Sequence, residues 1–363
     1  MEENARVFGG ERKISMKAYI WNADGTARLA DRPMPEILEP RDAIVRVRLS
    51  TICTSDLHIL HGAVPRAVPG TALGHEFVGE ITALGEGVRS LSVGQRVAAN
   101  CITFCGECWF CRRGYVNNCE KGGWELGCRI DGCQAEYVRV PFADMGITPI
   151  PDGVRDESAL FLGDILASGY FGAELCALRP GDTAAVIGAG PVGLCAMQAA
   201  RLFGAAKVVA IDIDESRLAV ARREGLADLC LNPQKAEIES AVREASCGRG
   251  ADGVIEAAGG DGTFEMAWKI ARPNAVVALV AMYERDQVLP LPSMYGKNLI
   301  FKTGGVDAAR SDELMRLLES GRLRTDFLIT HRGPLDRIEE GYRVFGEKLD
   351  GCLKWAVTPY EGK

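Results

Sequence analysis

The chain has 363 residues, enough to bury two hydrophobic cores, and its 47% hydrophobic and 25% charged residues are ordinary for a soluble globular protein. A net charge of -7 and a pI near 5.4 exclude a strongly basic surface that tracks phosphates, so nucleic acid is not expected as a partner. The apolar runs, such as AVVALVAM from Ala275, are far shorter than a membrane span, so no membrane is expected as a partner either.

The N-terminal residues 1–15, MEENARVFGGERKIS, are charged and polar and lack an apolar core segment. A secretory signal peptide needs such a segment, so we predict an extension that precedes a first strand opening at Met16. The chain holds 13 cysteines. Without an export signal, clustered thiols are expected to be metal ligands or free thiols of a cytoplasmic protein rather than disulfides.

The first part of the chain, up to about Leu160, is rich in short β-like runs that Gly and Pro interrupt. They include AIVRVRLSTI from Ala43, EFVGEITALG from Glu76, QRVAAN from Gln95 and AEYVRV from Ala135. Short strands with such breaks are typical of β-rich domains. We predict a compact β-barrel-like domain that carries long functional loops.

From about Leu160 the pattern changes to strands that alternate with helices. DTAAVIGAGPVGLCAMQAARLFGA contains a strand, a tight glycine turn and a helix, and KVVAIDID with ESRLAVARREG repeats the strand and the helix. Two further apolar strands, DGVIEAAG and NAVVALVAM, flank the helical stretch GTFEMAWKIA. This alternation predicts an α/β fold with a doubly wound parallel sheet of the Rossmann type. Past Thr303 we expect a helix (SDELMRLLES), a β-like FLITH and a last helical segment (LDRIEEGYRVF).

The GAGPVG turn lies between a predicted strand and a predicted helix. Its glycines permit a sharp turn and bring backbone N–H groups close to a pyrophosphate, which the helix N-terminus stabilises. The residues of this predicted dinucleotide site are Gly188, Gly190, Pro191, Val192 and Gly193.

Asp212 ends the next strand, nineteen residues after Gly193. An acid at this point can bind the hydroxyls of the adenosine ribose, and its charge repels a 2′-phosphate. The following residues, Ile213 and Asp214, offer no cation to hold that phosphate, so NAD is favoured over NADP. Arg217 lies nearby and is a further candidate for cofactor binding. Because it is a cation, it leaves NADP as the alternative coenzyme.

The run CGECWFCRRGYVNNC contains four cysteines, Cys105, Cys108, Cys111 and Cys119. Their C-x2-C-x2-C-x7-C spacing supplies four thiolates to one tetrahedral ion, and zinc suits sulfur ligands in this geometry. The alternatives are an iron–sulfur cluster, although the flanking Pro and the spacing of bacterial ferredoxins are missing, and four unrelated free cysteines. Because protein would fill all four positions of the ion, we predict a structural zinc lobe over residues 101–119 that has no open position for a substrate.

A catalytic zinc needs three protein ligands and one open position. CTSDLH and GHE provide Cys53 and His75, each beside a predicted strand, and Asp164 in LFLGDILASGYFGA can complete the set. Spacing alone leaves this trio open. A single His is more often a buried or surface residue than a ligand, and an Asp near a helix start is commonly a cap.

These motifs occur together in one known family. CTSDLH, GHE, the four-Cys lobe, GDILASGYFGA and GAGPVGL have the order and approximate spacing found in the zinc-containing medium-chain alcohol dehydrogenases, which the chain resembles over residues 16–358. The resemblance implies a GroES-like β-rich catalytic domain of residues 16–164 and 305–363 and a Rossmann NAD-binding domain of residues 165–304. It further implies hydride transfer between an alcohol and NAD, one catalytic and one structural zinc ion per chain, and a homodimer or homotetramer.

The resemblance also assigns roles around the catalytic zinc. It implies that Cys53, His75 and Asp164 bind this ion between the domains. It implies that Glu76 lies next to the metal and takes part in ligand exchange. Asp56 is expected to hydrogen-bond the second ring nitrogen of His75, which would fix the tautomer of that ring.

A zinc ion lowers the pKa of a coordinated alcohol, and the alcohol proton must then leave a buried site. Ser55 and His58 match the family's proton relay to solvent, and Ser168 lines the site by the same matching. The alternatives are a local turn hydroxyl for Ser55 and a surface helix residue for His58.

Asp as the third zinc ligand occurs in bacterial secondary-alcohol dehydrogenases and in the formaldehyde dehydrogenase group. The stretch DGCQAEYVRVPFAD, residues 131–144, together with GDILASGYFGA is closest to bacterial relatives of the second group. The chain is shorter than those formaldehyde enzymes, so the likeness does not fix the substrate. A polyol or amino-alcohol dehydrogenase and a formaldehyde dehydrogenase-like enzyme are the alternatives to a general alcohol dehydrogenase.

Two other classes of protein compete with an enzyme acting on small alcohols. The four-Cys lobe also suits a zinc-ribbon nucleic-acid binder, but the acidic pI and the dinucleotide motif oppose that class. A structural protein that retains a dehydrogenase fold is the other, and the intact metal and relay residues oppose it.

Overall fold

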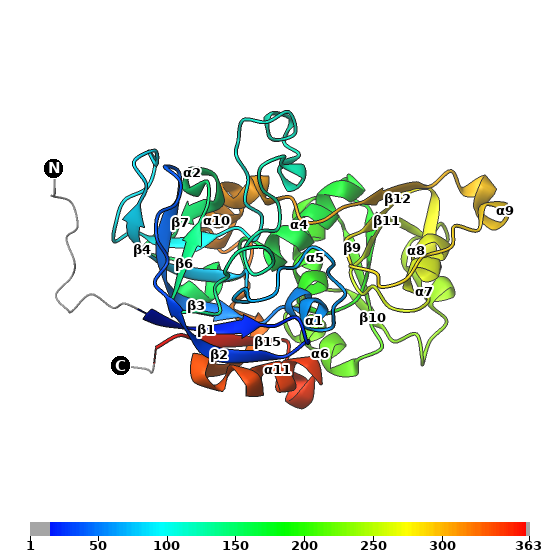
Figure 1. The fold of residues 1–363 in the computed structure, drawn as a ribbon. Helices are drawn as coiled ribbons and strands as arrows, with labels where there is room; N and C mark the ends of the chain where they lie inside the picture. The colour runs from blue at the N-terminus through cyan, green and yellow to red at the C-terminus, as the bar shows by residue number, and fades with distance from the viewer. Residues whose placement is uncertain (1–14, 361–363) are drawn as a thin grey trace.

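The computed structural model describes residues 15–360. Two β-sheets form the two halves of the molecule, the first built mainly from the N-terminal part of the chain and the second from its middle (Figure 1). The predicted N-terminal extension lies, except for Ser15, outside the described residues. No helix within residues 15–360 is long and apolar enough to cross a bilayer.

The first sheet has seven strands in the order β14-β15-β3-β4-β5-β7, with β6 paired to β3. Its pairings are antiparallel except for β14 with β15, which are parallel. The strands are β3 (Ala43–Thr51), β4 (Phe77–Leu84), β5 (Arg96–Ala99), β6 (Tyr137–Val140), β7 (Ile147–Pro149), β14 (Ile329–Pro334) and β15 (Lys354–Thr358). A separate hairpin of β1 (Ser15–Trp21) and β2 (Ala27–Pro33) packs beside it. This sheet confirms the predicted β-rich domain.

Short helices and a long loop follow individual strands of the first sheet along the chain. They are α1 (Thr54–Leu60), α2 (Ala143–Gly146), α3 (Asp156–Ala159) and the 3-10 turns η1 (Cys111–Arg113) and η2 (Val116–Asn118). The loop that carries η1 and η2 projects from the top of the molecule in Figure 1 and contains the four-Cys motif.

The second sheet is parallel, with six strands in the order β10-β9-β8-β11-β12-β13. The strands are β8 (Thr183–Ile187), β9 (Lys207–Ile211), β10 (Leu229–Leu231), β11 (Ala251–Glu256), β12 (Ala271–Leu279) and β13 (Ile300–Thr303). The helices between them are α5 (Pro191–Leu202), α6 (Glu215–Arg223), α7 (Ile238–Ala245), α8 (Thr263–Ile270) and the short α9 (Leu291–Met294). The strand order reverses between β8 and β11, which is the point where open α/β sheets bind ligands. The doubly wound fold predicted from the alternating pattern is confirmed.

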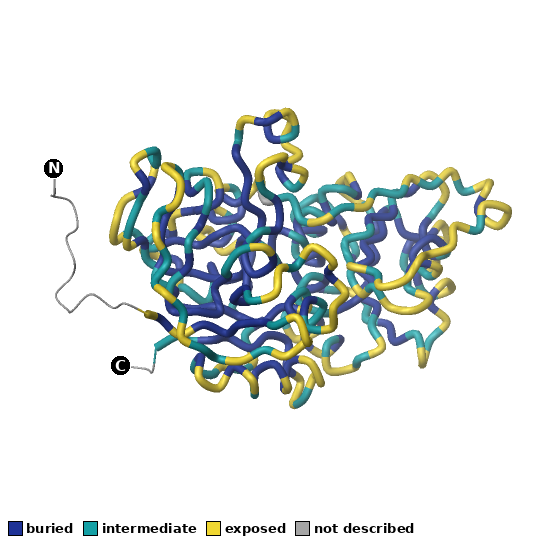
Figure 2. The backbone as a smooth tube through the Cα atoms, viewed as in Figure 1, coloured by how far each residue is buried: buried dark blue, intermediate teal, exposed yellow. Residues whose placement is uncertain are grey.

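Helix α4 (Ile165–Cys176) connects the two halves. One hydrophobic core includes Leu49 of the first sheet, Leu166 of this helix and Val186 of the second sheet, so the halves share buried surface. Gly169 makes the crossing of α4 over α5 possible, because a Cβ atom there would lie 2.6 Å from the backbone of Ala196. Figure 2 shows the buried backbone concentrated in the sheets and at this junction.

After β13 the chain returns to the first half. Helix α10 (Ser311–Glu319) docks there, and Ser311 donates a hydrogen bond of 2.6 Å to Asn100. Strands β14 and β15 then join the first sheet, and α11 (Ile338–Gly346) lies between these two strands along the chain. On this basis we propose residues 16–164 and 305–363 as one domain and residues 165–304 as the other.

Candidate active site and metal centres

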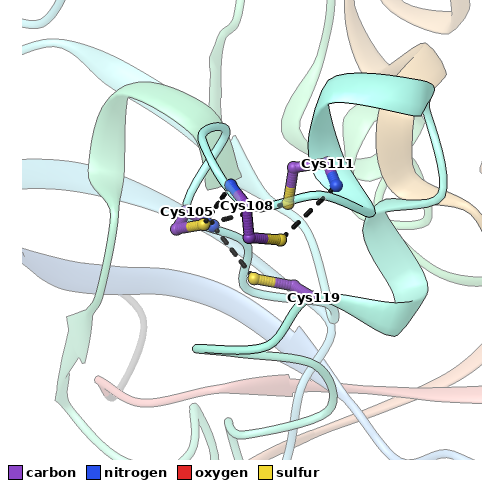
Figure 3. A group of neighbouring side chains, drawn as sticks. All are labelled: Cys105, Cys108, Cys111 and Cys119. Atoms are coloured by element: carbon purple, nitrogen blue, oxygen red, sulfur yellow. Dashed lines mark hydrogen bonds between the residues drawn. The ribbon is translucent and has the colours of Figure 1, made fainter.

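The four cysteines of the projecting lobe converge on one point (Figure 3). One ligand atom from each lies within 4.8 Å of the others, and the sulfurs of Cys105 and Cys111 are 4.0 Å apart. A disulfide would require about 2.05 Å, whereas ligands of one tetrahedral zinc lie about 3.8 Å from each other, given a Zn–S distance of about 2.3 Å. The donor set and spacing therefore fit zinc.

Backbone N–H groups in this lobe point at the sulfurs. The N–H of Cys108 lies 3.4 Å from Cys105 Sγ, and that of Cys111 lies 3.5 Å from Cys108 Sγ. Bonds of this kind favour the thiolate. They lower the pKa of Cys108 to about 6, with the N–H groups of Cys111 and Glu120 as the main causes. The loop thus favours the thiolate at Cys108, whereas burial raises the pKa of Cys111 to about 12 and that of Cys119 as well.

A second convergence involves Cys53, His75, Glu76 and Asp164, with one ligand atom of each within 4.8 Å of the others. Cys53 is the N-cap of α1, and His75 with Glu76 directly precedes β4. Asp164 is the N-cap of α4, but its side chain makes no capping hydrogen bond. The side chain of Asp164 therefore does not cap the helix, contrary to the alternative interpretation of this residue.

The two oxygens of Asp164 have different surroundings. Oδ2 lies 3.2 Å from His75 Nε2 and 3.6 Å from Cys53 Sγ. Oδ1 accepts a hydrogen bond from Ser168 Oγ at 3.4 Å and lies 3.7 Å from the sulfur of Cys101. The contacts on Oδ1 orient the carboxylate, so that Oδ2 is the oxygen presented to a shared cation.

Burial makes this set of ligands dependent on a cation. Burial raises the pKa of the Cys53 thiol, against the opposing charge of Lys354. Burial alone would lower the pKa of His75, but Asp56 and Asp164 raise it well above its ordinary value. Without a metal, a proton on the imidazole compensates the carboxylates. A dication can replace that proton, and a thiolate, an imidazole and a carboxylate are ligands that zinc accepts.

Sequence reasoning missed Lys354, which is buried beside this site. Its Nζ donates a hydrogen bond to Ile52 O at 3.1 Å and forms an ion pair with Oε2 of Glu76. The available signal was a charged residue inside the apolar run CLKWAV, because a buried charge needs a partner. Cys101, to which the sequence assigned no function, was missed as well.

The expected relay residues lie on α1, next to the metal ligands. Ser55 Oγ lies 3.8 Å from Cys53 Sγ. His58 lies farther along the helix, and its Nδ1 is 3.2 Å from Glu284, which follows β12 of the parallel sheet. Ser55 thus lies beside the buried ligands, and His58 lies beside Glu284, whose side chain is 65% exposed.

Asp56 points away from these residues into the interior. Its Oδ1 lies 3.3 Å from Nδ1 of His75, and its Oδ2 accepts a hydrogen bond from the backbone of Cys53. Trp124 packs edge-on against His75, with ring centroids 5.6 Å apart. The imidazole is thus held on two sides.

The GAGPVG motif forms a turn between β8 and α5. Gly188 has a φ of +95°, and a Cβ atom on Gly193 would lie 1.8 Å from Gly188 O, so neither position tolerates a side chain. Helix α5 begins at Pro191, and Val192 lies in its first turn, where backbone N–H groups have no helical partner. The turn therefore fits the pyrophosphate of a dinucleotide.

Asp212 and Arg217 flank this turn. Asp212 follows β9, and its Oδ2 accepts a hydrogen bond of 2.6 Å from the N–H of Ala189. Its Oδ1 accepts one of 2.8 Å from Asp214 N. The guanidinium of Arg217 reaches over Gly190, where it lies 3.4 Å from the position of a Cβ. Both side chains thus lie beside the glycine turn that is expected to bind the dinucleotide.

Two family models match the chain. The alcohol dehydrogenase GroES-like domain matches residues 39–152, and the zinc-binding dehydrogenase matches residues 191–320.

The chain is also similar to individual dehydrogenases. An alcohol dehydrogenase of Cupriavidus necator is 38% identical, over 95% of this chain and 99% of that protein. An NADP-dependent isopropanol dehydrogenase of Thermoanaerobacter brockii is 32% identical, over 90% of this chain and 94% of that protein. The structure of zinc dependent alcohol dehydrogenase 2 from Streptococcus pneumonia in its apo form superimposes with a TM-score of 0.90 at 36% identity, covering 96% of this chain and all of that one. The chain belongs to the zinc-containing medium-chain alcohol dehydrogenase family, whose cofactors are zinc and a nicotinamide dinucleotide.

Proposed function

We propose that this protein catalyses reversible hydride transfer between a small alcohol and NAD, which yields an aldehyde or a ketone. The observation that carries the proposal is the buried set of Cys53, His75 and Asp164 at the start of α4, the helix that packs on α5 next to the dinucleotide turn. A metal site and a nucleotide site on two helices in contact place a substrate oxygen and a hydride acceptor in one cleft.

Cys53, His75 and Asp164 would hold the catalytic zinc. The ion would supply Lewis acidity toward the alcohol oxygen. Glu76 stands within reach of the same ligand atoms but is paired with Lys354, so we assign it to ligand exchange rather than to permanent ligation. Ser168 holds the carboxylate of Asp164 from the opposite side.

Ser55 and His58 would conduct the alcohol proton to solvent. The hydroxyl of Ser55 lies beside Cys53; in this proposal it accepts the proton of a bound alcohol while it donates its own hydroxyl proton toward His58. His58 takes up that proton and releases one from Nδ1, which faces Glu284. Because the site itself is buried, proton transfer through side chains replaces access of bulk water.

We assign NAD as the preferred coenzyme. The carboxylate of Asp212 keeps its place through two backbone N–H groups, and a fixed negative charge there repels a 2′-phosphate. The similarity to an NADP-dependent isopropanol dehydrogenase makes this a point to test, and Arg217 is the cation that would favour the phosphate.

The decisive experiment is a screen of primary, secondary and polyhydric alcohols and of formaldehyde, with NAD and NADP in parallel and zinc measured in the same samples. We expect NADH formation with at least one simple alcohol and about two zinc ions per chain. Turnover confined to polyols, amino alcohols or formaldehyde would select one of the alternative substrate classes. Absence of NADH and NADPH formation from every substrate in a sample with both zinc ions would overturn the proposal.

We further propose a homodimer or homotetramer that forms through β13, the strand at the edge of the parallel sheet. An edge strand exposes unpaired backbone groups, and apolar side chains gather near this one. They include Ile300 (51% exposed), Leu291 (61%), Val288 (79%) and Tyr295 (89%). Light scattering should give a dimer or tetramer. Ile300→Lys should shift it toward monomer, whereas Val93→Lys, at an equally exposed position of the other domain, should not.

We place the protein in the cytoplasm, because a site built from four thiolates is stable in a reducing compartment. Its partner in the proposed reaction is a small molecule.

A further inference from the structure

A chain of buried polar side chains leads from His75 to the C-terminal part of the protein. Nδ1 of His75 lies 3.3 Å from Asp56 Oδ1, and Asp56 Oδ2 accepts a hydrogen bond of 3.1 Å from Gln134 Nε2. Gln134 Oε1 in turn accepts one of 2.8 Å from the hydroxyl of Tyr342 in α11. All four residues are buried, with exposures of 7% or less. Both Gln134 and Tyr342 lie in stretches that the sequence analysis names, DGCQAEYVRVPFAD and LDRIEEGYRVF, but neither received a role there.

The chemistry of these groups gives the chain a direction. The amide oxygen of Gln134 receives the Tyr342 hydroxyl, so the amide nitrogen must face Asp56. This nitrogen donates to Asp56 Oδ2 and also to the carbonyl of Thr51 at 3.3 Å. Oδ2 therefore has two donors, the Gln134 amide and the Cys53 backbone, and the carboxylate is fixed in rotation.

The fixed carboxylate leaves one oxygen for His75. Asp56 Oδ1 and His75 Nδ1 lie 3.3 Å apart, and within the described part of the protein neither atom has another hydrogen-bond partner. A carboxylate oxygen accepts, so the ring nitrogen that faces it, Nδ1, carries a proton. When a cation replaces the second proton of the imidazole, the lone pair it binds is therefore on Nε2, the nitrogen that faces Asp164, the expected co-ligand.

Close packing prevents Gln134 from turning away. Gly74, with a φ of +95°, lies against it, and a Cβ atom on Gly74 would be 2.7 Å from Gln134 Cγ. On the far side, the ring of Tyr342 packs on Tyr19, with centroids 5.1 Å apart. The amide can therefore neither flip nor withdraw without disturbing several elements.

We propose that Gln134 and Tyr342 are positioning residues of the catalytic metal site. They orient Asp56 so that His75 presents Nε2 to zinc, and they make metal binding depend on helix α11. The inference rests on the proposed function in one respect, the role of His75 as a metal ligand.

The test compares Tyr342→Phe with Tyr19→Phe in the full-length protein. Tyr342→Phe removes only the hydroxyl that binds Gln134, whereas Tyr19→Phe removes a hydroxyl from the neighbouring ring that takes no part in the chain. Cobalt is exchanged into the catalytic site, its visible absorption is recorded, and metal affinity is measured by competition with a chelator. Loss of partners that orient a metal ligand typically costs about 10–100-fold in affinity, so we expect roughly 10-fold weaker binding and a shifted cobalt spectrum for Tyr342→Phe alone.

Gln134→Glu is the second variant, because it replaces the donor that faces Asp56 with a further acceptor. We expect a larger loss of affinity than for Tyr342→Phe. Affinity and spectrum equal to the wild type in both variants would overturn the proposal. Loss of the metal from the four-Cys lobe together with the catalytic metal would overturn it too. Such a result would mean that the hydrogen-bonded series from Tyr342 to His75 supports the fold as a whole.

No substrate is needed for these measurements, which separates this inference from the proposed function. If the wild-type protein oxidises no alcohol but the variants still change cobalt binding as expected, the proposed function fails and the positioning role stands. If the variants oxidise alcohol and bind cobalt as the wild type does, only the positioning role fails.

Discussion

Lys354 and Glu76 form an ion pair inside the protein, with both side chains only 1% exposed. Burial alone would lower the pKa of Lys354, but Cys53 and Glu76 raise it above its ordinary value. The lysine therefore stays charged beside the metal ligands. It compensates Glu76, so that the remaining anions, Cys53 and Asp164, are left to a dication.

Lys354→Met should destabilise the protein strongly, because it leaves the Glu76 carboxylate buried without its partner. Breaking a buried ion pair costs about 3–5 kcal/mol, and chemical denaturation would measure this loss. Lys17→Met is the matched control, since it breaks a pair with Asp31 in which both side chains are more than half exposed. It should cost less than about 1 kcal/mol. Equal losses in the two variants would contradict the prediction.

The contribution of Glu76 to the stability of the protein without catalytic zinc should fall as the pH rises from about 4.5 to about 7. Burial raises the pKa of Glu76 from 4.5 to about 7, against the opposing charge of Lys354. In this pH range the folded protein holds a proton that the unfolded chain releases, so rising pH favours unfolding. Denaturation of chelator-treated protein across the range checks this. Glu76→Gln should flatten the decline, and an equally steep decline in that variant would assign it to another group.

The two zinc sites should be separable by mutation. Asp164→Ala should remove about one zinc ion per chain and lower activity by more than about 100-fold, because it deletes the carboxylate that faces Cys53 and His75. Cys111→Ser should also remove about one zinc ion, but from the projecting lobe, with rapid proteolysis of residues 101–119 as its signature. Metal analysis, turnover and limited proteolysis distinguish the two. Full zinc content and activity in Asp164→Ala would remove this residue from the site.

Asp212→Asn should weaken the preference for NAD. The amide oxygen can still accept the N–H of Ala189, so the turn keeps its support while the negative charge is lost. Hydrogen bonds to a charged group contribute about 1.5–3 kcal/mol, which corresponds to a decrease of roughly 10–100-fold in kcat/KM for NAD. NADP should be used better than by the wild type. Asp24→Asn is the control, since Asp24 accepts the N–H of Thr26 in the turn between β1 and β2 and should leave the preference unchanged.

Local sequence features predicted the parts of the protein that local geometry decides. Cys105 and Cys119 stand at the ends of one short loop, so their spacing was enough to predict a shared ion. The role of Gly188 and Gly193 in a tight turn was predictable in the same way, because the turn between β8 and α5 requires residues without a Cβ atom. The doubly wound sheet followed from strands that alternate with helices, a pattern that hydrophobic periodicity records directly.

Long-range contacts lay beyond such reasoning. The set of Cys53, His75 and Asp164 became a prediction only through the likeness to a family, because three ligands on separate elements have no spacing that defines a site.

The sequence by itself determined the two kinds of sheet, the dinucleotide turn and the thiolate loop, since each depends on residues that are neighbours along the chain. Only the tertiary structure decided that Lys354 neutralises Glu76 and that Tyr342 orients His75 through Gln134. These pairings bring the C-terminal strand and helix against the N-terminal half. A buried charge or hydroxyl must find its partner in space, and the identity of that partner is fixed by packing rather than by distance in sequence.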